Sequence, residues 1–139
     1  MGDYLKITEG YLPFRGYQTY YRIVGDRQSE LTPLLLLHGG PGSTHNYFES
    51  FDELSRQTGR PIIMYDQLGC GRSSMPDKPE LWQASTWVAE LQALRTALDL
   101  PAIHLLGQSW GGMLAIIYSC DYQPQGLKSL ILASTLSSA

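Results

Sequence analysis

The sequence lacks an excess of positive charge and any long apolar run. Its 139 residues contain 10 lysines and arginines against 13 aspartates and glutamates, which gives a net charge of −3. This balance excludes the basic surface of a nucleic-acid-binding protein and gives no sign of a patch for anionic membranes. No apolar stretch approaches the roughly 18 residues that cross a bilayer. The sequence therefore predicts one globular domain, with neither nucleic acid nor membrane as a partner.

Cysteine is also scarce. The two cysteines, Cys70 and Cys120, lie too far apart in sequence to indicate a metal-binding pair or a disulfide framework. The first ten residues include Asp3 and have no apolar core, so they do not resemble a secretory signal peptide. Lys6 stands where myristoylation requires Ser or Thr. We therefore expect a protein of a reducing compartment, the cytoplasm, that binds no metal.

Phosphate-binding glycine motifs are absent or incomplete. No G-x-x-x-x-G-K-[ST] pattern occurs, which excludes a P-loop. Gly69-Cys70-Gly71 matches the start of a dinucleotide fingerprint, but Ser74 stands where the third glycine is needed, and no helix is predicted directly behind it. The sequence therefore predicts no cofactor.

Short apolar runs alternate with amphipathic stretches along the chain. Such alternation predicts an α/β fold, with a mostly parallel sheet and helices on both faces. Buried strands are expected at 34–37, 62–65, 102–106 and 129–133, with a further strand at 17–24. Helices are expected from Ser43 or Thr44 to about Thr58, near Thr86–Leu98, and from Met113 to Tyr118.

The motif with the most chemical content is Gly107-Gln108-Ser109-Trp110-Gly111, a G-x-S-x-G pattern. It follows a predicted strand and precedes a predicted helix, which is the context of a nucleophile elbow. Glycines two positions before and two after the serine leave room for a close backbone approach. We expect Ser109 to be the nucleophile and the Trp110 N–H to be an oxyanion donor. The alternative is a serine that only caps the helix in a tight turn.

A second glycine-rich loop, His38-Gly39-Gly40-Pro41-Gly42, follows the strand at 34–37. Its glycines expose backbone N–H groups, and Gly40 is the candidate for the second oxyanion donor. The alternative is a turn whose glycines serve backbone geometry alone. We expect His38 to fix this loop by hydrogen bonds rather than to act as a base. All these loops follow the carboxyl ends of strands, so they are predicted to converge on one site.

The other polar and aromatic candidates are assigned structural roles. His45 is expected on the surface of a helix, and His104 within the sheet. Asp66 and Arg72 are expected to pin the loop at 66–74 rather than to react. Packing roles are expected for three further side chains: Cys70, Trp82 and Trp87.

Three segments together resemble the proline iminopeptidases of the α/β-hydrolase superfamily. They are HGGPG at 38–42, DQLGCGRS at 66–73 and GQSWGGML at 107–114. The resemblance covers essentially the whole chain, including similarity to the family's first strands near residues 16–22. It implies that Ser109 is the nucleophile and that Gly40 and Trp110 are the oxyanion donors. The implied activity removes an N-terminal proline, or another small residue, from peptides.

The resemblance also implies a longer polypeptide. In the family, the helical cap domain, the triad acid and the triad histidine follow the strand that ends here near Ala133. After Ser109 this sequence has one carboxylate, Asp121, and no histidine. We therefore expect residues 1–139 to form the N-terminal part of an α/β-hydrolase core. The triad Asp and His would come from the remainder of the same polypeptide or from a second chain.

Three functions stay open at this point. The first is a serine exopeptidase that acts on small peptides. The second is another acyl hydrolase on the same fold, such as an amino-acid amidase or an esterase. The third is an inactive fragment or interaction module that pairs with another chain through the apolar edge strand at 129–133.

Overall fold

The structure is a computed structural model that describes residues 6–26, 29–39, 51–74 and 83–133. Ten elements follow one another along the chain: β1 (Ile7–Phe14), β2 (Tyr17–Val24), β3 (Leu34–Leu37), α1 (Asp52–Thr58), β4 (Ile62–Tyr65), α2 (Ala84–Ala97), β5 (Ile103–Gln108), α3 (Trp110–Ile117), the π-helix η3 (Tyr118–Tyr122) and β6 (Leu127–Ala133). Within these ranges, no helix combines the length and apolar character that crossing a membrane requires.

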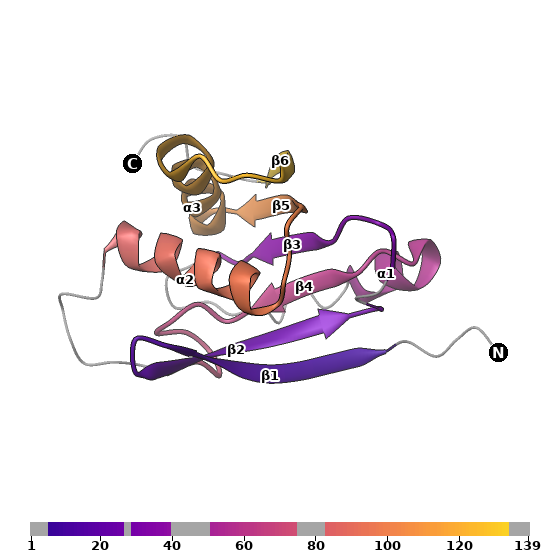
Figure 1. Ribbon diagram of the computed structural model, residues 1–139, viewed down its shortest axis with the longest axis horizontal. Helices are drawn as coiled ribbons and strands as arrows, with labels where there is room; N and C mark the ends of the chain where they lie inside the picture. Colours follow the sequence, from indigo (N-terminus) through magenta and orange to yellow (C-terminus); the bar gives the residue numbers. More distant parts are fainter. Residues whose placement is uncertain (1–5, 27–28, 40–50, 75–82, 134–139) are drawn as a thin grey trace.

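The strands form one sheet in the order β1-β2-β4-β3-β5-β6, which runs from bottom to top in Figure 1. Strands β3, β4, β5 and β6 pair in parallel, whereas β1 and β2 pair antiparallel to each other, and β2 pairs antiparallel to β4. The arrowheads of β3, β4 and β5 point the same way in Figure 1, so their carboxyl ends meet at one edge of the sheet. The predicted mostly parallel sheet is confirmed.

Each face of the sheet carries its own core. Because side chains alternate along a strand, Leu35 and Leu37 of β3 point to one face and Leu34 and Leu36 to the other. Helices α2 and α3 cover the first face, and α2 crosses in front of the sheet in Figure 1. Phe51, just before α1, packs on the second face. The predicted placement of helices on both faces is therefore confirmed.

The N-terminal hairpin was only partly predicted. Strand β2 occupies the predicted residues, but β1 was not expected, because Gly10 and Pro13 interrupt its apolar pattern. It is an edge strand, where a missing proline N–H leaves no partner unpaired. Arg15 and Gly16 join the two strands with φ angles of 50° and 83°. Two successive positive φ angles are typical of the tight turns that match the twist of a hairpin.

Helix boundaries differ from the predictions in part. Helix α1 ends at Gly59, which has a φ of 76° and whose N–H donates to the Ser55 carbonyl, as expected for a C-terminal glycine. The predicted start at Ser43 or Thr44 lies outside the described residues. Helix α3 begins at Trp110 rather than Met113, because the turn at Ser109 leads straight into helical backbone, and it continues beyond Tyr118 as η3.

Strand β6 is longer and more exposed than predicted. It begins two residues before the expected position, and an irregularity in its pairing with β5 lies between Ile103 and His104. Leu130, Ile131 and Leu132 are 37–45% exposed, so the expectation of a buried strand is wrong for the described residues. The reason is its position, since β6 is the last strand in the sheet order.

Candidate active site

The chain turns from β5 into α3 at Ser109. The backbone φ of Ser109 is 55° and its ψ is −118°, a conformation that residues with side chains rarely adopt. Strain of this kind costs about 1–3 kcal/mol and collects at functional sites. The predicted strand-to-helix turn is confirmed, and its serine is strained.

The two motif glycines are required by close backbone contacts. A Cβ atom on Gly111 would lie 2.1 Å from the carbonyl oxygen of Leu37. A Cβ atom on Gly107 would lie 2.3 Å from the carbonyl oxygen of Gly111. Neither position therefore accepts a side chain while the backbone stays in place. The predicted close approach is confirmed, and Gly111 seats the turn against the end of β3.

The Ser109 side chain does not cap α3. Its hydroxyl makes no capping hydrogen bond to the helix. The backbone of Ser109 closes the turn instead: its carbonyl accepts from the N–H groups of Gly112 at 2.9 Å and Met113 at 3.2 Å. Its own N–H donates to the carbonyl of Ala133 at 3.2 Å. The geometry thus does not support the alternative of a helix-capping serine.

Trp110 is the first residue of α3. A backbone N–H in the first turn of a helix has no acceptor inside the helix, and it lies at the positive end of the helix dipole. These are the properties that a donor to a developing oxyanion needs. The role of Trp110 stays a prediction. Gly40, the other predicted donor, lies outside the described residues, as do His45 and Trp82.

The buried side chain of Gln67 joins the three predicted loops. The Gln67 backbone N–H donates to Nε2 of His38 at 2.9 Å, and its side-chain amide donates to the His38 carbonyl at 3.1 Å. The Trp110 indole N–H donates to Oε1 of Gln67 at 3.0 Å. The loops that follow β3, β4 and β5 therefore meet at one edge of the sheet, as predicted.

His38 fixes its loop, as predicted. The ring is fully buried. Because Nε2 accepts from Gln67, the proton lies on Nδ1, which donates to the carbonyl of Gly39 at 2.6 Å. Both ring nitrogens are thus engaged in holding backbone. His104 lies in the sheet, where its Nδ1 is 2.7 Å from the Ser129 hydroxyl.

The loop after β4 is pinned to β2. The Asp66 carboxylate accepts from the Arg72 backbone N–H at 2.9 Å, and the Asp66 N–H donates to the Tyr20 carbonyl at 2.9 Å. Ser73 adds a third link, since its hydroxyl accepts from the Tyr20 N–H at 2.8 Å. The Arg72 guanidinium lies 5.0 Å from the centre of the Tyr20 ring. The predicted pinning role of Asp66 and Arg72 is confirmed.

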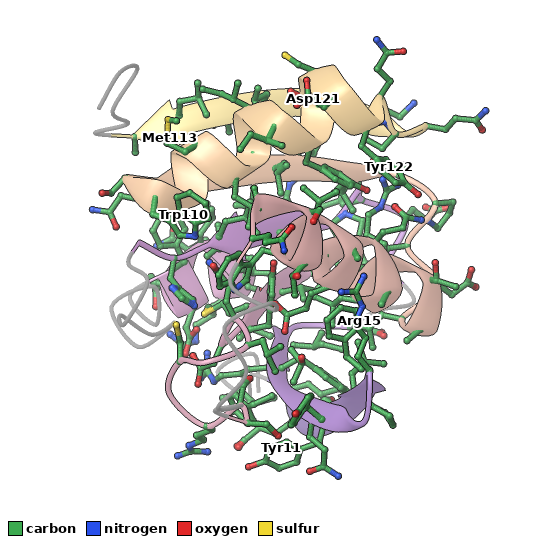
Figure 2. The ribbon with its side chains drawn as sticks, turned by 90° about the vertical axis from the view of Figure 1, so that its left-hand side faces the viewer. Tyr11, Arg15, Trp110, Met113, Asp121 and Tyr122 are labelled. Atoms are coloured by element: carbon green, nitrogen blue, oxygen red, sulfur yellow. The ribbon has the colours of Figure 1, made fainter. Side chains whose placement is uncertain are left out.

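Asp121 is not placed to serve the nucleophile. It is exposed on η3, and Figure 2 shows it at the opposite end of the α3–η3 segment from Trp110. No histidine follows Ser109 in the sequence. The described residues therefore bring neither a triad acid nor a triad base to Ser109 from the part of the chain beyond it.

Both cysteines are free thiols in the described ranges. Cys70 is buried and packed, as expected, whereas Cys120 is exposed. These ranges hold neither a disulfide nor a group of three or more His, Cys, Asp or Glu side chains that could bind a metal ion.

Glu90 of α2 is a buried carboxyl that the sequence analysis missed. Its oxygens accept from the Leu68 N–H at 2.9 and 3.1 Å, and from the Thr19 hydroxyl at 2.5 Å. Burial raises the pKa of Glu90 to about 7, although both hydrogen bonds act to lower it. A signal was present in the sequence: an acid three residues after Trp87, on the face that carries Leu91.

This buried carboxyl predicts a pH-dependent stability. Its pKa is about 7 in the folded protein against an ordinary value of 4.5. Between these pH values the folded state holds a proton that the unfolded chain has lost. The free energy of unfolding should therefore fall as pH rises through this window, by up to about 3 kcal/mol. Glu90→Gln has no proton to lose at this position and should lack this fall.

Urea unfolding of both proteins at pH 5 and pH 8 measures the effect, because the other titrating groups are common to the two proteins. The wild-type protein should lose stability relative to Glu90→Gln between the two pH values. A stability difference that stays constant over this range would contradict the prediction.

Comparison with known proteins shows which family the chain resembles. Residues 32–139 match the model of a family described as alpha/beta hydrolase fold. The proline iminopeptidase of Lactiplantibacillus plantarum is 83% identical over 128 residues, which cover 92% of this chain and 45% of that protein. The proline iminopeptidase of Levilactobacillus brevis is 74% identical over 135 residues, which cover 97% of this chain and 45% of that protein.

A solved structure agrees. The crystal structure of a proline iminopeptidase from Mycobacterium smegmatis matches with a TM-score of 0.87 at 38% identity, and covers 94% of this chain and 45% of that one. The chain thus spans about half the length of the curated relatives it matches. The resemblance to proline iminopeptidases is confirmed. Since the family model matches most of its residues, the chain belongs to the alpha/beta hydrolase fold family.

Proposed function

We propose that this chain carries the nucleophile and oxyanion hole of a serine peptidase. The peptidase would release an N-terminal proline, or another small residue, from peptides. The observation that carries the proposal is Ser109, held at a φ of 55° between β5 and α3 with a hydroxyl that makes no capping bond. The names of the relatives, proline iminopeptidases at 83% and 74% identity, support the substrate class.

In the proposed reaction, the Ser109 oxygen attacks the carbonyl carbon of the N-terminal residue while a histidine takes the hydroxyl proton. The carbonyl oxygen becomes an oxyanion that accepts from the N–H groups of Trp110 and Gly40. The C–N bond then breaks, and the histidine gives its proton to the leaving amine. Water attacks the resulting acyl-enzyme with the same histidine as base, which releases the amino acid and restores Ser109.

We also propose that residues 1–139 form the N-terminal part of an α/β-hydrolase core. The cap domain, the rest of the core, and the triad Asp and His would then lie in further polypeptide. Relatives of about twice this length support this division, as does the row of exposed apolar side chains on β6. A cytoplasmic location belongs to the same proposal and agrees with the lack of a disulfide among the described residues.

A fluorophosphonate probe, which reacts with activated serines, tests the nucleophile in the complete protein. One label is expected, at Ser109, when the labelled peptides are mapped by mass. Turnover of proline p-nitroanilide, proline amide and a simple ester then tests the substrate class, and the proline p-nitroanilide should be preferred. Failure to label Ser109 would overturn the whole proposal. Labelling with turnover of the ester alone would leave the nucleophile in place and refute the peptidase assignment.

A further inference from the structure

Leu68 is held on both sides of its backbone by α2. Glu90 accepts from the Leu68 N–H at 2.9 and 3.1 Å, and the Trp87 indole N–H donates to the Leu68 carbonyl at 3.2 Å. Trp87 and Glu90 lie three residues apart, so they share one face of the helix. The Leu68 side chain is itself buried, with 1% exposure. This residue of the loop after β4 is therefore fixed by two side chains of α2.

Gln67, the residue before Leu68, binds Trp110, which is the neighbour of the nucleophile in sequence. Gln67 accepts from the Trp110 indole N–H at 3.0 Å. The rings of Trp87 and Trp110 also meet edge to face, with centroids 5.9 Å apart and 79° between their planes. Trp110 is thus held both by the loop and by α2. It adjoins Ser109 in sequence, and its backbone N–H opens α3.

We propose that Glu90 and Trp87 are positioning residues, which hold Leu68 so that Gln67 and Trp110 keep the Trp110 N–H where the oxyanion forms. The kinetic part of this inference rests on the proposed function. An apolar side chain in place of Glu90 would leave the buried Leu68 N–H without its acceptor.

The side chains packed around Glu90 do not compete with Leu68 for its carboxyl. Thr19 reaches it from β2. Tyr65 of β4 lies close enough for the charge of Glu90 to raise the pKa of its hydroxyl, after burial and together with Tyr118 and Cys70. The Tyr65 hydroxyl has no hydrogen-bond partner among the described residues, so it does not compete for the carboxyl. The hydrogen bond from the Leu68 N–H is therefore the contact that links Glu90 to the site.

The test measures kcat and KM in the complete protein, counted per active site labelled by the fluorophosphonate probe. Glu90→Ala removes the acceptor and should lower kcat at least ~10-fold while KM changes less than ~3-fold, since small misplacements of reacting groups cost large factors in rate. Glu90→Gln keeps an oxygen acceptor for the Leu68 N–H and should recover kcat to within ~3-fold of wild type.

Thr19→Val is the matched control. It removes the other partner of the carboxyl and leaves Leu68 held, so it should lower stability while kcat stays within ~3-fold of wild type. Trp87→Phe keeps an aromatic ring at this position and removes the indole N–H that donates to Leu68. The double variant with Glu90→Ala should show a smaller fold-loss of kcat than the product of the two single losses, because both side chains act through Leu68.

Because kcat is calculated per labelled site, unfolded molecules, which take no label, do not lower its value. A loss of kcat for Glu90→Ala smaller than ~10-fold would overturn the proposal. If the wild-type protein takes no label, the proposed function fails, and the positioning link is read from the NMR resonances of the Leu68 amide and the Trp110 indole N–H. Both should shift in Glu90→Ala and return toward wild type in Glu90→Gln. An unchanged Trp110 resonance would refute the link whether or not the protein is active.

Discussion

Replacing Ser109 with alanine should lower kcat in the complete protein by about 10⁴–10⁶, the range seen when serine hydrolases lose their nucleophile. The expected cause is the loss of the attacking oxygen alone, because the turn itself is built from backbone contacts. Hydrolysis of proline p-nitroanilide measures the effect. A loss of less than ~100-fold would contradict the role of Ser109.

The fold should tolerate this change. The Ser109 hydroxyl makes no capping bond, and alanine inherits the same φ of 55°, so the melting temperature should stay nearly unchanged. Ser109→Gly should be equally inactive yet more stable by about 1–2 kcal/mol, because glycine adopts positive φ angles without strain. Urea unfolding of the three proteins separates the strain from the chemistry. A glycine variant no more stable than the alanine variant would refute the assignment of strain to this turn.

Replacing Gly111 with alanine should damage both the fold and the activity. Inside a helix, alanine is normally preferred to glycine by about 1 kcal/mol. Here the added Cβ would lie 2.1 Å from the Leu37 carbonyl and 2.7 Å from that of His38, both rigid backbone atoms. We expect the free energy of unfolding to fall by about 3 kcal/mol. The turn must also move away from β3, which should lower kcat by about 100-fold.

Gly59→Ala is the control for Gly111→Ala. Gly59 has a φ of 76°, and a Cβ there would meet nothing within 4 Å, so this variant measures backbone strain without a clash. Its free energy of unfolding should fall by about 1 kcal/mol, and its activity should be unchanged. Urea unfolding and turnover of proline p-nitroanilide compare the two variants. A Gly111→Ala protein as stable and active as Gly59→Ala would show that the backbone yields at the elbow.

The parts of the fold that could be predicted are those whose signal is local. The four leucines of β3 and the run at Ile62–Tyr65 are buried on both faces, so they lack alternation and stand out as short apolar runs. Strand β1 was missed because it lies at an edge. There one face meets solvent, and Pro13 is tolerated although it argues against a strand in sequence.

The same distinction applies to the site. The turn at Ser109 could be predicted because a strained serine needs glycines close by in sequence. The links from the Gln67 side chain to the His38 carbonyl and to Trp110 could not, because an amide side chain carries no sign of its partners and these lie far along the chain. Glu90 lies between these cases. An acid on the apolar face of a helix indicates a buried partner but does not name it.

The sheet order also bears on how the protein folds. In β3, Leu34 pairs with Ile62 on one side and with His104 on the other, so the central strand is completed by segments from distant parts of the chain. During synthesis, one edge of this four-leucine strand stays open until β5 has been made. Such non-local parallel pairing is slow, and it leaves apolar side chains and an unpaired strand edge exposed to other chains. The nascent chain is therefore prone to aggregation after β4 and before β5, in the interval during which α2 is being made.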